Sequence, residues 1–160
     1  MNTSNLSSLI WNTADDVLRG LFKPHEYGSV ILPFVVMRRL DCTLEKTKDQ
    51  VLETYKKLES NINPTPVIKK QIGLPYFNNS KFDLSRLKED PDNVYLNFNN
   101  YLQGFSDDVR DILENFKMDP LIKKLNEDDS LYLLIDKFTE IKTESQKRLG
   151  PNIDAVTLTT

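Results

Sequence analysis

The chain has 160 residues, of which 39% are apolar and 28% charged, as is typical of one globular domain. Its net charge of −3 argues against strong autonomous binding of nucleic acid, which needs a dominant basic face. One cysteine and one histidine exclude an internal disulfide and a structural zinc site. No apolar stretch is long enough to span a membrane and the first nine residues are too polar for a signal peptide, so we expect a cytoplasmic protein.

The first helix is predicted over residues 6–21. Its apolar side chains recur at three- and four-residue steps and so share one face: Leu6, Leu9, Ile10, Ala14, Val17, Leu18 and Leu21. Gly20 is a stop signal near the end of this run. Trp11 lies at the edge of the apolar face, and we expect it to pack in the core rather than to stack on a nucleic-acid base.

A second, longer helix is predicted over residues 26–60. Its first half is apolar over a broad surface, and its second half carries a narrower apolar stripe. Pro33 disturbs this helix because it has no N–H to donate to the carbonyl of Ser29. We expect either a kink at Pro33 or a helix that begins just before it.

Residues 61–93 are predicted to form one long irregular loop, because helical periodicity fades there. Turn-forming residues punctuate the segment: Pro64, Pro66, Gly73, Pro75, Asn78, Asn79, Ser80 and Pro91. Short apolar pairs leave open a very short β-hairpin over residues 76–82. A loop of this length in a compact domain is usually functional or held in place by its side chains.

Helical spacing returns with an apolar segment over residues 94–105. Three helix-start signals then follow, each with acids or a proline beside the capping residue: Ser106-Asp107-Asp108, Asp119-Pro120 and Asp128-Asp129-Ser130. The last signal opens a helix predicted to reach Ile141. The whole pattern predicts an all-α bundle of about five to seven helices. We expect this helical domain to cover residues 1–148 and a linker to cover residues 149–160.

No group of residues in the sequence forms a recognisable catalytic, cofactor or metal site. There is no glycine-rich turn of the kind that holds a nucleotide cofactor. The run 63–66, Asn-Pro-Thr-Pro, is only superficially similar to the Asn-Pro-Pro-aromatic motif of amino methyltransferases, and we interpret it as loop. Asp136, Glu140 and Lys142 are interpreted as a solvated helix face. His25 has no catalytic companion, and we expect it to cap or pack near the second helix.

The candidate contacts with DNA or a partner share a positive charge: Arg19, Lys23, Arg38 and Arg39. Arg38 and Arg39 are adjacent and point about 100° apart on a helix, so they cannot lie on the same face. We favour a structural role for this pair, in which one arginine binds Asp41 or Glu45. The alternative is that the other arginine reaches a phosphate or a partner subunit, within a modest patch that Arg19 and Lys23 extend.

Two stretches resemble a known family, the type I restriction-modification methylase subunits. The first, residues 9–41, contains LIWNTADDVLRG, HEYGSVILPF and MRRLD, similar to the family's tryptophan-bearing helix, Tyr-Gly turn, proline-containing apolar run and Arg-Arg-Leu-Asp. The second, residues 97–106, reads NFNNYLQGFS and is similar to Asn-aromatic-x-x-Tyr-x-x-Gly-Phe-Ser. The resemblance covers residues 6–142 in the same order.

This resemblance implies a helical N-terminal domain followed by a Rossmann-like domain, which uses S-adenosylmethionine to methylate the exocyclic amino group of adenine. It also implies two methylase subunits and one specificity subunit around double-stranded DNA, with the N-terminal domains helping to close the clamp. Motor-nuclease subunits join this complex for restriction.

The cofactor glycines and the Asn-Pro-Pro-aromatic motif are not in these residues, so no catalytic residue carries over and the fragment alone is expected to be inactive. The alternative from another class is a free-standing helical protein-interaction module. A reading frame that continues past Thr160 into a methyltransferase would favour the first interpretation, and a stop codon there the second.

Overall fold

The computed structural model describes the backbone of residues 3–149 and the side chains of residue 8 and residues 10–140. Its helices in chain order are α1 (Thr3–Leu18), α2 (Tyr27–Leu44), α3 (Lys48–Lys57), α4 (Pro64–Ile72), α5 (Leu84–Leu87), α6 (Val94–Gln103), α7 (Asp107–Glu114), α8 (Met118–Glu127) and α9 (Ser130–Leu149). The 3-10 turns are η1 (Pro24–Glu26), η2 (Glu45–Thr47) and η3 (Pro91–Asn93). Residues 3–149 contain no strand, which confirms the predicted all-α class.

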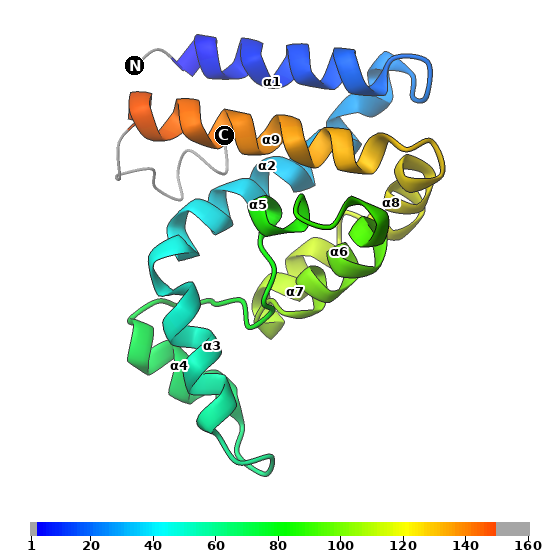
Figure 1. Cartoon of the computed structure of the whole chain (residues 1–160). Coiled ribbons are helices and arrows are strands. Elements are labelled where there is room, and N and C mark those ends of the chain that lie inside the picture. Colours follow the sequence, from blue (N-terminus) through cyan, green and yellow to red (C-terminus); the bar gives the residue numbers. More distant parts are fainter. Residues whose placement is uncertain (1–2, 150–160) are drawn as a thin grey trace.

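The first and last helices lie side by side at one edge of the molecule. Figure 1 shows α1 and α9 running antiparallel, with α2 crossing next to them, α5 to α7 below, and α8 at the edge where α9 begins. An aromatic cluster joins these helices: Phe34 lies 5.7 Å from Phe98 and 5.8 Å from Phe138 between ring centroids. Each buried ring of this kind contributes about 1.5–3 kcal/mol relative to an exposed one. The main core is therefore built from residues far apart in the sequence.

The prediction of one continuous helix over residues 26–60 is wrong, because α2, η2 and α3 occupy this range. α2 begins at Tyr27 and runs through Pro33, so the alternative of a start just before the proline is also wrong. Pro33 is buried beside Ile31 and Phe34, and their burial offsets the missing hydrogen bond. The break comes instead at η2, where the Thr47 hydroxyl donates to the carbonyl of Leu44 at 3.1 Å.

The predicted loop over residues 61–93 contains α4, α5 and η3, so this prediction is wrong for much of the segment. Asn63 is the N-cap of α4, and its side chain accepts the N–H of Thr65 at 3.1 Å. Pro64 and Pro66 both fall in the first turn, where a backbone N–H has no partner within the helix. Gly73 then ends the helix with φ +70°. The prolines are therefore start signals rather than loop signals.

The β-hairpin considered for residues 76–82 is not present. Asn78 instead makes an isolated antiparallel bridge to Phe105, at the end of α6. The N–H of Ser106 donates to the carbonyl of Phe77 at 2.9 Å, and the Ser106 hydroxyl accepts the N–H of Phe77 at 3.3 Å. The N-cap hydroxyl predicted to cap α7 is therefore used to hold this connection. Backbone pairing over a long sequence separation is not visible in local periodicity.

Other local predictions differ in detail. α8 begins at Met118, one residue before the predicted cap, after Lys117 in a left-handed conformation at φ +52°. α9 passes the predicted end at Ile141 and continues to Leu149, and most of the predicted linker lies outside the described residues. The core position expected for Trp11 is wrong, because the residue is 52% exposed. The packed face of α1 is centred on Ala14 and Leu18, and a side chain at its edge is only half covered.

Candidate functional site

A buried polar network is centred on Asp41 of α2. The Tyr101 hydroxyl of α6 donates to Asp41 Oδ1 at 2.6 Å, and the N–H of Leu84 in α5 donates to Oδ2 at 2.8 Å. Arg38 Nη1 lies 3.9 Å from the same Oδ2, at the limit of an ion pair. Asp41 therefore ties three helices together through charge-assisted hydrogen bonds.

Burial dominates the electrostatics of this group. It raises the pKa of Asp41 to about 6, against the opposing effects of the Tyr101 hydroxyl, the Leu84 N–H and Arg38. Burial also raises the pKa of Tyr101 well above its ordinary value, and the neighbouring Asp41 charge adds to this shift. Burial lowers the pKa of Arg38, whose Nε and Nη2 have no hydrogen-bond partner. These groups bind one another and present no free reactive atom to a substrate.

Asn78 is a second centre, next to the first. Its Oδ1 accepts from Lys48 Nζ at 3.0 Å and from the N–H of Ser80 at 2.8 Å. Its Nδ2 donates to the carbonyl of Tyr101 at 2.9 Å, which connects the two centres. Burial lowers the pKa of Lys48 to about 8, although Asp41 and Asp83 favour its charged form. The side chain of Asn78 thus uses both its acceptor and its donor inside the protein.

Gly104 permits the close approach of the connection after α4. A Cβ at this position would lie 2.6 Å from Asn78 Oδ1 and 2.6 Å from the backbone nitrogen of Ser80, so no other residue fits without movement. The carbonyl of Gly104 accepts the N–H of Asn79 at 2.8 Å. The glycine is required here because there is no space for a Cβ, and not because its backbone torsion angles are unusual.

The two stretches that carry the family resemblance meet in this network. Asp41 ends the Arg-Arg-Leu-Asp run, whereas Tyr101, Gly104 and Ser106 come from the second stretch. Sequence reasoning named Asp41 only as a partner for an arginine, and it missed Tyr101 and Asn78 as members of a site. The sequence did contain a signal for them: in both stretches, polar residues stand between aromatic residues of the core.

The structure does not bring the four predicted contact residues into one patch. Arg38 is buried and lies beside Asp41, as the structural interpretation of the pair expected, whereas Arg39 is half-buried. Arg19 and Lys23 are exposed near the turn between α1 and α2. At a rise of 1.5 Å per residue, Arg38 lies about 16 Å along α2 from Tyr27, the first residue of that helix after the turn. This length of helix separates Arg38 from the cations at the turn.

The surface around this turn carries both signs of charge. Arg19 pairs with Asp15 in the last turn of α1, and the backbone N–H of Lys23 donates to the Glu26 carboxylate at 2.8 Å. This hydrogen bond, with help from nearby cations, lowers the pKa of Glu26. Lys124 of α8 adds a charge at 4.4 Å from the Phe22 ring centroid. The positive surface at the turn is therefore small and partly neutralised.

The other residues singled out in the sequence do not form a site. His25 lies in η1 and is exposed, so it does not pack, and the N-cap of α2 is Glu26 rather than His25. Asp136 forms an ion pair with Lys88 at 3.2 Å, and Glu140 is exposed. The side chain of Lys142 lies outside the described residues. The described part of the chain contains neither a cluster of potential metal ligands nor a helix that could cross a membrane.

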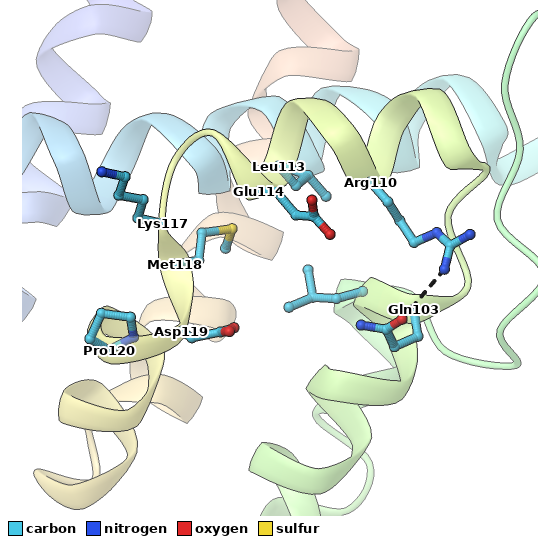
Figure 2. Close-up of a pocket in the computed structure, with 9 residues that line it drawn as sticks. Gln103, Arg110, Leu113, Glu114, Lys117, Met118, Asp119 and Pro120 are labelled. Carbon is cyan, nitrogen blue, oxygen red and sulfur yellow. Dashed lines mark hydrogen bonds between the residues drawn. The ribbon is translucent and has the colours of Figure 1, made fainter.

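A hollow of about 370 Å³ lies between the end of α6, α7 and the start of α8 (Figure 2). Its lining carries both signs of charge, from Arg110, Lys117, Glu114 and Asp119, and Figure 2 shows the Lys117 side chain pointing away from the hollow. Arg110 Nη1 donates to Gln103 Oε1 at 3.5 Å across its mouth. The lining carries no histidine, cysteine or serine, so it lacks the commonest general base and the commonest nucleophiles.

Comparison with known proteins identifies one family. The sequence profile described as the HsdM N-terminal domain matches residues 6–138. No curated protein and no solved structure matches the chain. The matched range includes the whole network around Asp41 and Asn78.

Proposed function

Because the chain belongs to the HsdM N-terminal domain family, found in the methyltransferase subunits of type I restriction-modification systems, we propose that it is the assembly and DNA-clamp domain of an adenine-specific enzyme. In this proposal a separate domain binds S-adenosylmethionine and transfers the methyl group. The partners are a specificity subunit, a second methylase subunit, a motor-nuclease subunit and double-stranded DNA, and the complex works in the cytoplasm. The observation that carries the proposal is the family match over residues 6–138.

The described residues support a scaffolding role within such a complex. Asp41 and Tyr101 of the family-like stretches form a network with Asn78 and Lys48, in which these side chains bind other parts of the same chain. Such a network stabilises one arrangement of helices, as a domain that positions other subunits requires. The pair Arg38 and Asp41 belongs to this network, so we assign Arg38 to the fold rather than to DNA contact.

Contact with DNA is proposed for the exposed cations at the turn between α1 and α2, namely Arg19 and Lys23, with Arg39 further along α2. The net charge of −3 means that few phosphates are neutralised by this domain. We therefore expect the domain alone to bind duplex DNA without sequence preference, at a dissociation constant of roughly 10⁻⁴ to 10⁻⁶ M at physiological salt. Specificity then comes from the other subunits.

The proposal is tested in the complex assembled with its specificity and catalytic partners. Such a complex is expected to transfer a methyl group from S-adenosylmethionine to adenine in duplex DNA, detected as N6-methyladenine after digestion. An assembled complex that methylates cytosine, or a chain that never enters such a complex, would contradict the proposal. Isothermal calorimetry on this domain alone is expected to show no stoichiometric cofactor binding.

The DNA contact is tested separately with Lys23→Glu, since the recorded hydrogen bond of Lys23 uses only its backbone. The variant complex is expected to assemble normally by native mass measurement and to bind cofactor unchanged. Its DNA affinity should fall, with a slope of log affinity against log salt that is shallower by about 1. Lys70→Glu, exposed on α4, is the matched control. Equal losses in both variants would show a general charge effect rather than a contact at the turn.

A further inference from the structure

One part of the domain has a core of its own. Residues 48–72, here called the arm, comprise α3, α4 and the connection between them, and Figure 1 shows the arm projecting from the end of the bundle opposite α1 and α9. Val51 and Ile68 are buried against each other and against Phe77, with Ile72 packed on them. This small apolar cluster is separate from the main core. Phe77 follows the arm in the chain and its backbone is hydrogen-bonded to Ser106, so this cluster is also the apolar contact between the arm and the bundle.

The arm joins the bundle at two breaks in helical structure. At its start, η2 separates α2 from α3, and the two helices do not form one continuous rod. At its end, Gly73 adopts φ +70°, and a Cβ there would meet nothing within 4 Å. Helix ends and glycines of this kind absorb the torsional changes of a hinge.

Apart from the packing of Val51 and Ile68 on Phe77, the recorded side-chain contacts between the arm and the bundle are polar. Asp49 meets Arg86 at 3.4 Å and Lys69 meets Asp108 at 3.5 Å, but both pairs are exposed and screened by solvent. The third contact differs, because Lys48 is buried and its Nζ reaches Asn78 Oδ1 at 3.0 Å. A buried hydrogen bond from a charged group stabilises far more than an exposed ion pair. Lys48 is thus the principal polar attachment of the arm.

We infer that the arm moves on the bundle as a unit, hinged at η2 and Gly73, and that the hydrogen bond from Lys48 to Asn78 is the latch that holds it. Opening the latch leaves the main core intact, because that core contains no residue of the arm. It separates Val51 and Ile68 from Phe77, which lies beyond Gly73, and so exposes α3 and α4 to exchange. Resting on the proposed function, this motion adjusts the domain to a neighbouring subunit of the complex. The latch itself is a property of the fold and is tested without DNA.

The test is amide hydrogen exchange on the intact protein carrying Lys48→Met, which keeps the unbranched stem and removes the donor. The Ser80 N–H continues to satisfy Asn78 Oδ1, so the acceptor is not orphaned. We expect amides of α3 and α4 to exchange together and at least about tenfold faster, the factor that one buried charge-assisted hydrogen bond supplies. Exchange in α1, α2 and α9 should not change.

Two further variants separate the latch from other effects. Lys57→Met makes the same substitution on α3 at an exposed residue and should leave exchange unchanged, because its partner Glu53 is on the same helix. Lys48→Arg keeps a donor and should restore most of the protection if the methionine variant loses it. Faster exchange throughout the bundle, or no change in the arm, overturns the inference. Neither result bears on adenine methylation by the complex, so the two proposals fail independently.

Discussion

The bundle and the arm are both built from helices, but they differ in the interactions that hold them in place. In the bundle, residues such as Phe34, Phe98 and Phe138 join α2, α6 and α9 across long sequence separations. In the arm, Val51 and Ile68 pack on Phe77 just beyond it, and polar contacts of Lys48, Asp49 and Lys69 complete the joint to the bundle. The stabilisation from apolar burial is proportional to the buried area and is lost only when the core opens. A hydrogen bond or ion pair at the joint can instead be replaced by hydrogen bonds to water. The comparison teaches that the bundle sets global stability and the arm sets local motion.

The largest expected effect comes from removing an aromatic ring from the bundle. Phe34→Ala should lower the free energy of unfolding by about 3–5 kcal/mol, because the ring is 1% exposed and its loss leaves a cavity. Urea unfolding followed by circular dichroism measures the change. Leu133→Ala, at a residue 42% exposed, is the control and should change stability by less than about 1 kcal/mol. Equal effects would refute the assignment of the main core.

The junction between the two regions should give stability an unusual dependence on pH. The pKa of Asp41 is raised to about 6, so the folded state binds the proton more tightly and stability falls as pH rises from 3.8 to 6. The pKa of Lys48 is lowered to about 8 from 10.5, so the unfolded state holds more protons between these values and stability rises with pH. The contributions of these two groups are least favourable between pH 6 and 8.

Urea unfolding at a series of pH values tests this profile. From the pKa shift, Asp41 accounts for about 3 kcal/mol across its window as an upper magnitude. Asp41→Asn should flatten the acid side, since an amide can still accept the Leu84 N–H and contact the Tyr101 hydroxyl. A wild-type profile that rises steadily from pH 4 to 6, with no difference from the variant, contradicts the buried state of Asp41.

Substitutions at two glycines test whether close packing at the same junction stabilises the fold. Gly104→Ala should lower the free energy of unfolding by about 1–3 kcal/mol, because the new Cβ meets Asn78 and the backbone of Ser80. Gly28→Ala is the matched control, since its Cβ meets nothing within 4 Å inside α2. It should stabilise the protein by about 0.5–1 kcal/mol through helix propensity. Two changes of the same sign in thermal unfolding would contradict this account.

The sequence predicted the bundle better than it predicted the arm and the junction. Repeats of apolar residues three or four apart specify which face of α1 or α9 is buried, and local periodicity contains that information. Pro64 and Pro66 misled the prediction for α4, because a proline has the same appearance in a loop and in the first turn of a helix. The contact of Lys48 with Asn78 spans 30 positions, and no local pattern encodes it.

The candidate site shows the same limit. Its two halves were visible as stretches similar to one family, but nothing in either stretch indicates that Asp41 binds Tyr101 across 60 positions. Arg38 and Arg39 are adjacent in sequence, and only the packing of α2 decides that Arg38 faces inward. Residue type and spacing therefore identified the segments that matter, while tertiary packing determined their partners.

The smallest expected effect concerns the exposed ion pairs at the joint of the arm. Asp49→Asn combined with Lys69→Met removes both pairs, at 3.4 Å and 3.5 Å, and leaves Lys48 in place. Exposed pairs contribute roughly 0–1 kcal/mol each, and high salt weakens them further. The double variant should therefore change urea stability little and leave hydrogen exchange in α3 and α4 near that of the wild type. If its arm exchanges as fast as that of Lys48→Met, the surface pairs hold the arm and the buried lysine does not.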